Sequence, residues 1–141
     1  MKLFIQLLRL DMSITVEFHA GSLTLVVVTH LHEETHIRDD LEPFQAKLTL
    51  SEFLVLKALV AHRGQHLSKE HLTHVGWPQS YVGPNSLNMS IMSLRKKLSY
   101  LGGFWQISTI QRHGYSLDQT LSHRYSQINV VHFGLIGTVE Y

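Results

Sequence analysis

The chain has 141 residues, no cysteine and a formal net charge of +1, and 44% of its residues are hydrophobic. This length suits one domain, or one domain with an extension, and the apolar fraction is sufficient for a core and argues against disorder. The absence of cysteine excludes disulfide bonds, thiolate catalysis and cysteine-ligated zinc. No apolar run reaches the roughly 18–20 residues that a membrane-spanning helix needs.

Charged residues are unevenly distributed along the chain. Residues 1–70 contain seven Lys or Arg and nine Asp or Glu, a net charge of −2, and residues 118–141 have a net charge of −1. The segment between them, residues 71–117, has no acidic residue and four cations, Arg95, Lys96, Lys97 and Arg112. We call residues 71–117 the acid-free segment. A positive segment in a nearly neutral chain is typical of a nucleic-acid-binding face.

The first 48 residues are expected to form a small antiparallel sheet. Apolar and polar residues alternate over residues 14–18, and β-branched residues are frequent over 23–28, after a turn that contains Gly21. These patterns predict two strands joined by a turn. A second pair of strands is expected near residues 36–38 and 44–48, on either side of a segment with turn-forming residues.

Three helices are expected after the sheet. Thr49 and Glu52 match a capping box, in which the Thr hydroxyl and the Glu carboxylate accept hydrogen bonds from backbone amides at the start of a helix. This first helix is expected to end near Gly64. Ser68 is a suitable N-cap for the second helix, which is expected to end near Trp77 because a proline follows.

The third helix is expected over residues 85–101, with Asn85 or Ser86 as its N-cap. Its apolar residues recur at i, i+4, i+7, i+11 and i+14, which predicts one buried stripe formed by Leu87, Ile91, Leu94, Leu98 and Leu101. We call these five residues the leucine stripe. The opposite, outward face is expected to hold Asn85, Met89, Met92, Ser93 and Lys96, with Asn88, Arg95 and Lys97 on its flanks.

A β-hairpin is expected after the third helix. Strands at 105–110 and 115–117 flank the segment Gln111-Arg112-His113-Gly114, in which Gly114 supplies backbone freedom for the turn. Trp77 and Trp105 are expected to pack in the core.

Several motifs occur in the order found in a known family. They are Leu48-Thr49 before Glu52, Trp77 at the end of the second helix, Leu94-Arg95-Lys96-Lys97-Leu98, and Thr109-Ile110 before Gly114-Tyr115. Over about residues 12–118 the chain resembles the winged-helix effector domain of OmpR/PhoB-type and ToxR/CadC-like bacterial transcription regulators. The resemblance implies an α+β, winged helix-turn-helix fold with an N-terminal antiparallel sheet, a three-helix bundle and a C-terminal β-hairpin wing. We expect three regions, the sheet at 1–48, the DNA-binding core at 49–118 and a C-terminal extension, also β, at 119–141.

The resemblance implies that the third helix enters the major groove of double-stranded DNA and that the wing, residues 105–117, lies at the adjacent minor groove or backbone. The side chains expected to contact bases are Asn85, Asn88, Met89, Met92 and Ser93. Those expected nearer to phosphates are Ser86, Arg95, Lys96 and Lys97. The wing would contribute Gln111, Arg112 and His113.

The chain departs from the family pattern at two places. Many family members have arginines on the outward face of the third helix, where this chain has Met89, Met92 and Ser93. Methionine can contact thymine methyl groups but makes no bidentate contact with guanine, so either an A/T-rich promoter site read largely by shape or a low specific affinity is expected. In the wing, the family often has Arg at the position of Gln111, and here Arg112 follows one residue later.

Two further function classes were weighed against a DNA-binding transcription regulator. The outward methionines and the low net charge suit a winged-helix module for protein–protein interaction, with weak or no specific DNA binding. An enzyme is not expected, because the chain has no GxSxG or P-loop motif and no cysteine nucleophile, and no cofactor is expected either. The resemblance also implies a bacterial, cytoplasmic protein that binds DNA as a homodimer, with a protein partner left open.

Histidine is unusually frequent, with 11 residues. His30, His32 and His36, together with Glu34, would share one face of a strand because their spacing is even. Such a row could bind a divalent metal or respond to acidification. An exposed strand face explains the spacing equally well, and no metal site is expected.

The C-terminal residues 119–141 show strand-like patterns. Apolar residues are frequent over 128–133 and 135–139, and two glycines interrupt them. We expect extra strands here or an oligomer contact, such as pairing with the N-terminal strand.

Overall fold

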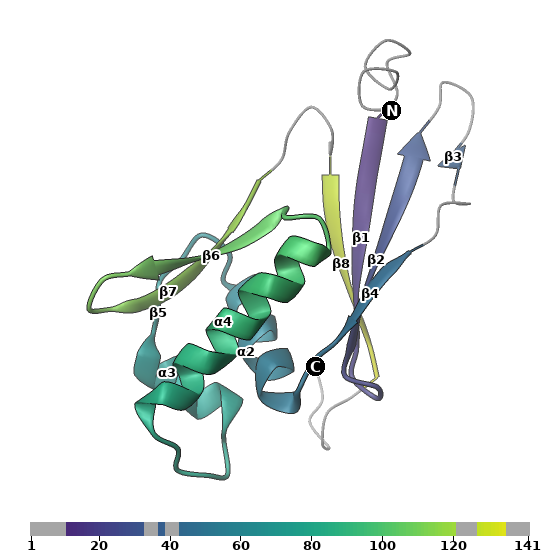
Figure 1. The fold of residues 1–141 in the computed structure, drawn as a ribbon. Helices are drawn as coiled ribbons and strands as arrows, with labels where there is room; N and C mark the ends of the chain where they lie inside the picture. Colours follow the sequence, from purple (N-terminus) through teal and green to yellow (C-terminus); the bar gives the residue numbers. More distant parts are fainter. Residues whose placement is uncertain (1–10, 33–36, 39–42, 121–126, 135–141) are drawn as a thin grey trace. The chain divides into compact units, whose positions relative to one another are not determined.

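The computed structural model describes residues 11–32, 37–38, 43–120 and 127–134. These residues divide between two compact units, Met1–Lys47 with Leu121–Tyr141, and Leu48–Thr120. The strands of the first unit are β1 (Asp11–His19), β2 (Thr24–His32), β3 (Ile37–Arg38), β4 (Phe44–Lys47) and β8 (Gln127–Phe133). The elements of the second unit are α2 (Leu50–Ala61), β5 (Leu67–Ser68), α3 (Lys69–Gly76), α4 (Pro84–Tyr100), β6 (Trp105–Ile110) and β7 (Gly114–Gln119) (Figure 1).

The first unit is a β-sheet with the expected antiparallel strands. β1 and β2 are antiparallel, with Val16 opposite Val27, and both β3 and β4 pair antiparallel with β2. β8 pairs in parallel with β1 on its other side, with Val130 beside Val16. The expected pairing of the C-terminal segment with the N-terminal strand is therefore present. The strand predicted at 135–139 lies outside the described residues.

Alternation along the strands gives this sheet one buried face. Ile14, Val16 and Phe18 are buried, and the register places Val27 and Leu25 of β2 opposite the last two of these. Successive side chains of a strand point to opposite faces, so the period-two pattern of β1 is sufficient to bring these residues to one face.

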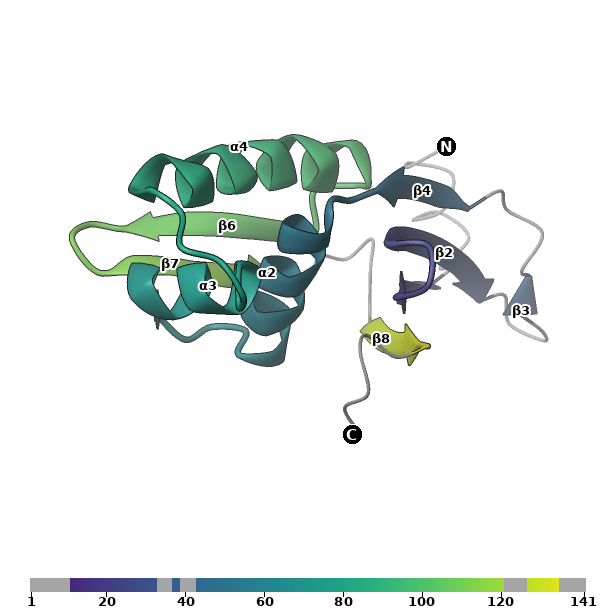
Figure 2. The same cartoon turned by 90° about the horizontal axis from the view of Figure 1, so that it is seen from below.

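The second unit contains three helices and the small sheet β5-β7-β6. The capping box is confirmed, since Thr49 Oγ1 accepts from the amide of Glu52 at 3.1 Å and Glu52 Oε1 accepts from the amide of Thr49 at 2.8 Å. Ser68 caps α3 as expected. β6 and β7 form the expected antiparallel hairpin, which we call the wing. Its tip extends past the helices of the unit in both views (Figure 1 and Figure 2).

The leucine stripe on α4 is confirmed, because all five of its side chains are buried. The predicted N-cap was wrong. Gly83 is the N-cap and Pro84 occupies the first turn. Proline suits that position because its fixed φ is already helical and its missing N–H has no acceptor there. Among the described residues, the model contains no helix with the length and hydropathy needed to cross a membrane.

The tip of the wing has a different backbone from the one expected. The left-handed residue of the turn is Arg112, with φ of 68°. Gly114 is required for another reason, because a Cβ at this position would lie 1.9 Å from the carbonyl oxygen of Leu67 on β5. The glycine therefore provides room for β5 to approach β7, and the turn itself is made by an arginine.

Candidate nucleic-acid interface

Four residues form an exposed stripe on α4, opposite the leucine stripe. They follow one another at intervals of four, three and four residues, the spacing that places side chains on one helix face. The exposed fractions of Met89 and Met92 are 56% and 52%. We call the set the outward stripe, which consists of Asn85, Met89, Met92 and Lys96.

Ser93, also predicted for the outward face, is half-buried and hydrogen-bonds to the carboxylate of Glu52. It lies between Met92 of the outward stripe and Leu94 of the leucine stripe, on the side of α4 that faces α2. The prediction of an outward position for Ser93 was therefore wrong. Ser86, in the first turn, is half-buried too, and its amide donates to the carbonyl of Gly83 at 3.1 Å.

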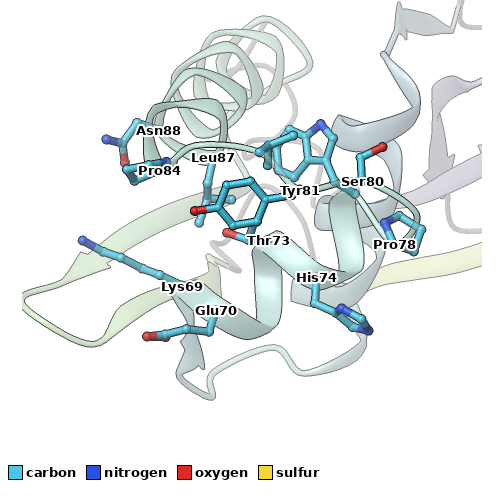
Figure 3. Close-up of a pocket in the computed structure, with 12 residues that line it drawn as sticks. Lys69, Glu70, Thr73, His74, Pro78, Ser80, Tyr81, Pro84, Leu87 and Asn88 are labelled. Carbon is cyan, nitrogen blue, oxygen red and sulfur yellow. The ribbon is translucent and has the colours of Figure 1, made fainter.

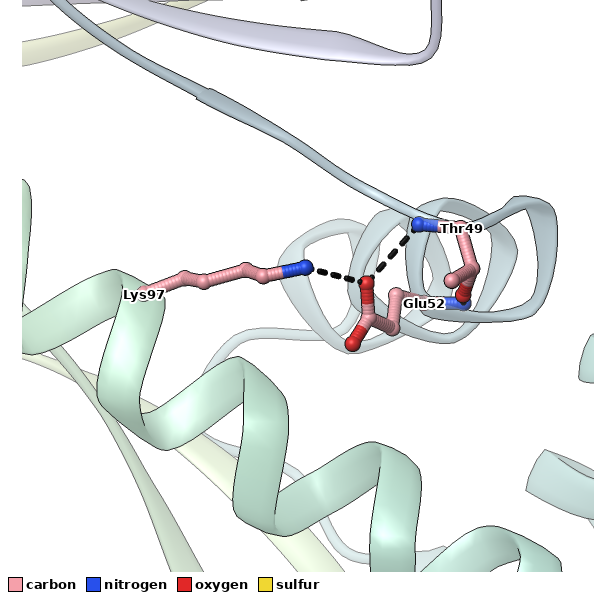
Figure 4. A network of polar contacts seen from close by, with 3 residues as sticks. All are labelled: Thr49, Glu52 and Lys97. Carbon is pink, nitrogen blue, oxygen red and sulfur yellow. Dashed lines mark hydrogen bonds and ion pairs between the residues drawn. The ribbon is translucent and has the colours of Figure 1, made fainter.

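Lys97 extends from α4 to α2 and pairs with Glu52. Its Nζ lies 2.7 Å from Oε1 of Glu52, the same oxygen that accepts from the amide of Thr49 (Figure 4). The side chain of Glu52 is 5% exposed and that of Lys97 is 30% exposed. One carboxylate therefore caps α2 and holds α4 beside it, and Lys97 is engaged inside the unit.

The surroundings of Glu52 favour its charged form. Burial by itself raises the pKa of this carboxyl, but the hydrogen bonds from Lys97, Ser93 and the Thr49 amide outweigh burial. The pKa of Glu52 consequently lies below its ordinary value of 4.5.

Arg95 is engaged with the wing. Its Nε donates to the carbonyl oxygen of Ile107 at 3.0 Å, and its Nη2 donates to Oγ1 of Thr109 at 2.8 Å. The guanidinium carbon lies 5.9 Å from the centre of the Tyr115 ring, within the range of a cation–π contact. Of the three consecutive cations 95–97, the first and third thus have partners within the unit, whereas Lys96 lies on the outward stripe.

Asn88 is also joined to the wing. The Tyr115 hydroxyl donates to its Oδ1 at 3.1 Å. The contacts of Thr109 and Tyr115 with α4 were not predicted from the sequence, although the position of the hairpin turn predicts that these two residues pair. A hairpin centred on residues 111–113 places Thr109 directly opposite Tyr115, as observed.

The wing tip presents three exposed side chains, Gln111, Arg112 and His113. The amide of His113 donates to the carbonyl of Ile110 at 2.9 Å and closes the turn. The carbonyl of His113 accepts from the amide of Lys69 at 3.3 Å, which connects the tip to the start of α3. The backbone of the tip is therefore held in place while its side chains remain exposed.

A cavity of about 550 Å³ lies at the N-terminal end of α4 (Figure 3). Its lining comes from α3, from the loop that follows and from the first turns of α4, including Leu87 and Asn88. Trp77, expected in the core, is half-buried and forms part of this lining, while Trp105 is buried as expected. Tyr81 is one of the lining residues labelled in Figure 3, and this residue is 98% exposed.

The histidine row, for which no metal site was expected, is only partly described. His30 lies on β2 with its Nε2 3.0 Å from Oγ1 of Thr15. The backbone of His32 is described, whereas Glu34 and His36 lie outside the described residues. Within the ranges that the structure covers, no group of three or more potential metal ligands occurs.

Residues 44–117 match the family model described as "Transcriptional regulatory protein, C terminal", which spans over half of the chain. The chain belongs to this family of OmpR/PhoB-type DNA-binding domains. The predicted α+β, winged-helix fold class is thereby confirmed. No curated protein sequence gives a significant match.

Three of the solved structures that match the chain are DNA-binding or C-terminal regulator domains. The DNA-binding domain of the response regulator AdeR, solved in complex with an intercistronic region, has a TM-score of 0.55 at 19% identity and covers 74% of this chain and 94% of its own. The C-terminal domain of the nisin resistance regulator NsrR has a TM-score of 0.48 at 28% identity, with 65% and 87% covered. The DNA-binding domain of E. coli CadC has a TM-score of 0.49 at 22% identity, with 76% and 94% covered. The likeness to AdeR supports the fold.

Proposed function

We propose that this DNA-binding domain places α4 in the major groove of double-stranded DNA and the tip of its wing at the adjacent minor groove or backbone. The observation that carries the proposal is the acid-free segment, which supplies α4 and most of the wing and contains cations but no Asp or Glu. A segment of this kind attracts phosphates, and none of its own side chains repels them.

The structure supports separate roles for the exposed residues. Lys96 on the outward stripe and Arg112 at the wing tip suit contacts with phosphates or with a narrow minor groove. Met89 and Met92 suit contacts with thymine methyl groups, and Asn85 can hydrogen-bond to a base edge. Together they favour A/T-rich promoter sites. A regulator of this kind acts where the chromosome lies, so the proposal implies the bacterial cytoplasm, and it allows a homodimer on DNA.

The proposal is tested by the affinity of the full chain for promoter-region DNA over a salt series. Log affinity should fall steeply as log salt concentration rises, and Lys96→Ala and Arg112→Ala should each reduce the magnitude of the slope by about 0.9. Arg63→Ala is the matched control, because Arg63 is an exposed cation outside α4 and the wing. A flat salt response of the unmodified chain would contradict the proposal.

The exposed methionines favour a second candidate function, a winged-helix module that binds a protein partner. Met89 and Met92 together place apolar surface at the centre of the outward stripe. If DNA binding is weak and insensitive to salt, and Lys96→Ala with Arg112→Ala has no effect on it, the protein-contact function becomes the better account.

A further inference from the structure

The guanidinium of Arg95 contacts both strands of the wing. Two of its three nitrogens donate to β6, to the Ile107 carbonyl and to Oγ1 of Thr109, and its carbon lies 5.9 Å from the centre of the Tyr115 ring on β7. The planar fork of an arginine can satisfy such an arrangement, whereas the single ammonium of a lysine cannot. These hydrogen bonds use two of the five guanidinium N–H groups and hold the side chain against the wing.

Tyr115 gives the wing a second point of attachment to α4. Its ring contacts Arg95 and its hydroxyl donates to Asn88, seven residues earlier on the same helix. Seven residues make two helical turns, so the two attachment points lie on one side of α4 and roughly 10 Å apart along its axis. Two separated contacts oppose rotation of the wing against the helix.

We propose that Arg95 is a positioning residue that fastens the wing to α4. The arrangement, which we call the helix–wing clamp, consists of Asn88, Arg95, Thr109 and Tyr115. This inference rests on the proposed function, since it assigns roles within the same DNA interface.

The clamp holds two DNA-contacting parts at a constant separation and angle. Lys96 and the other residues of the outward stripe would meet one groove while Arg112 meets the next, and a preorganised pair loses less conformational freedom on binding than two mobile elements. The clamp also orients Asn88. Because its Oδ1 accepts from Tyr115, its NH2 group remains available to donate to a base acceptor such as purine N7.

The test compares Arg95→Lys, Arg95→Ala and Thr109→Val with the unmodified full chain in DNA binding over a salt series. Arg95→Lys retains the charge, and Thr109→Val removes only the hydroxyl that accepts from Arg95. The clamp predicts that each of the three variants lowers affinity by roughly tenfold, with the salt slope unchanged. Combining Thr109→Val with Arg95→Ala should cost little more than Arg95→Ala alone, because the alanine already removes the hydrogen bond that Thr109→Val breaks.

A phosphate ligand would behave differently in the same measurements. Arg95→Lys would keep near-normal affinity, Arg95→Ala would lower the magnitude of the salt slope by about 0.9, as Lys96→Ala should, and the effects of Arg95→Ala and Thr109→Val would add. That result would overturn the inference and leave the proposed function standing. Failure of the unmodified chain to bind DNA would instead contradict the proposed function.

A second measurement follows the clamp without DNA. In the free protein, Arg95→Lys should raise amide hydrogen exchange in β6 and β7 and leave α2 protected as before. Unchanged exchange in the wing would overturn the inference, whatever the DNA affinity. Protection of α2 also confirms that the variant is folded.

Discussion

Glu52 shows how much one side chain contributes to the arrangement of the helices. Its Oε1 accepts from the Thr49 amide at 2.8 Å and from Lys97 Nζ at 2.7 Å. The first bond is local and belongs to the capping box, which the spacing of Thr49 and Glu52 predicted. The second joins residues 45 positions apart, and no local pattern indicates it.

Acid should weaken the fold through Glu52. Its pKa in the folded protein is lowered from 4.5, so its ionised form stabilises the fold above that pH, and this contribution is lost as the pH falls through the folded-state value. Glu52→Gln should lower the free energy of unfolding at neutral pH by about 1 kcal/mol and should flatten the decline below pH 4.5. Urea denaturation from pH 7 to pH 3 measures both effects. If the free energy of unfolding falls equally steeply with acid in both proteins, groups other than Glu52 dominate the acid sensitivity.

Gly114 should tolerate no side chain. A Cβ would lie 1.9 Å from the Leu67 carbonyl oxygen, so Gly114→Ala must displace β5 from β7. We expect a loss of about 2–3 kcal/mol in the free energy of unfolding. The matched control is Gly21→Ala, because no atom lies within 4 Å of a Cβ there, and it should change stability by less than about 0.5 kcal/mol. Equal effects of the two substitutions on urea denaturation would contradict this role of Gly114.

At the scale of the element, α4 has one buried face and one exposed face. Leu94 on the leucine stripe is fully buried, and Met92 on the outward stripe is 52% exposed. On one flank of the helix, Arg95 and Asn88 contact the wing, and on the other flank Lys97 contacts α2. The helix therefore has a buried face, an exposed face and two flanks that contact other elements. The periodicity of its apolar residues predicted the two faces but not the contacts of the flanks.

Truncating a side chain should lower the free energy of unfolding much more on the buried face of α4 than on its exposed face. Leu94→Ala should cost about 3 kcal/mol, because the cavity it leaves is surrounded by buried side chains. Met92→Ala should change the free energy of unfolding by less than about 0.5 kcal/mol. Chemical denaturation of both variants measures the difference. A large effect of Met92→Ala would mean that its side chain packs inside the unit.

Site preference should depend on the outward stripe. Met89→Ala should reduce discrimination in favour of A/T base pairs by about 1 kcal/mol while leaving non-specific binding nearly unchanged. Selection of bound sites from a randomised DNA pool, with competition by non-specific DNA, measures both. An equal loss of affinity for all DNA sequences would mean that Met89 contacts the DNA backbone and does not read bases.

At the scale of the whole molecule, the chain closes its first unit with a segment from its far end. β8 pairs in parallel with β1, so Val130 lies beside Val16 although more than a hundred residues separate them in the sequence. An unpaired edge of β1 would be open to pairing with other chains. The C-terminal strand covers that edge.

Removal of residues 127–141 should therefore destabilise the first unit selectively. Amide hydrogen exchange should become faster in β1 and remain unchanged in α4, and the truncated chain should aggregate more readily. Exchange mass spectrometry of the two proteins measures the first effect. Equal protection of β1 with and without β8 would show that the pairing contributes little.

The sequence by itself determined the helices, the strands apart from β5, the leucine stripe and the capping box of this protein, because each depends on neighbours within a few turns of the chain. The acid-free segment and the order of the family motifs were likewise visible without coordinates. Only the tertiary structure showed that Lys97 and Arg95 have partners inside the unit, that Ser93 faces Glu52, that Gly114 makes room for β5 and that β8 runs parallel to β1. These features depend on the reach of side chains and the register of strands between distant segments, which periodicity along one element does not specify.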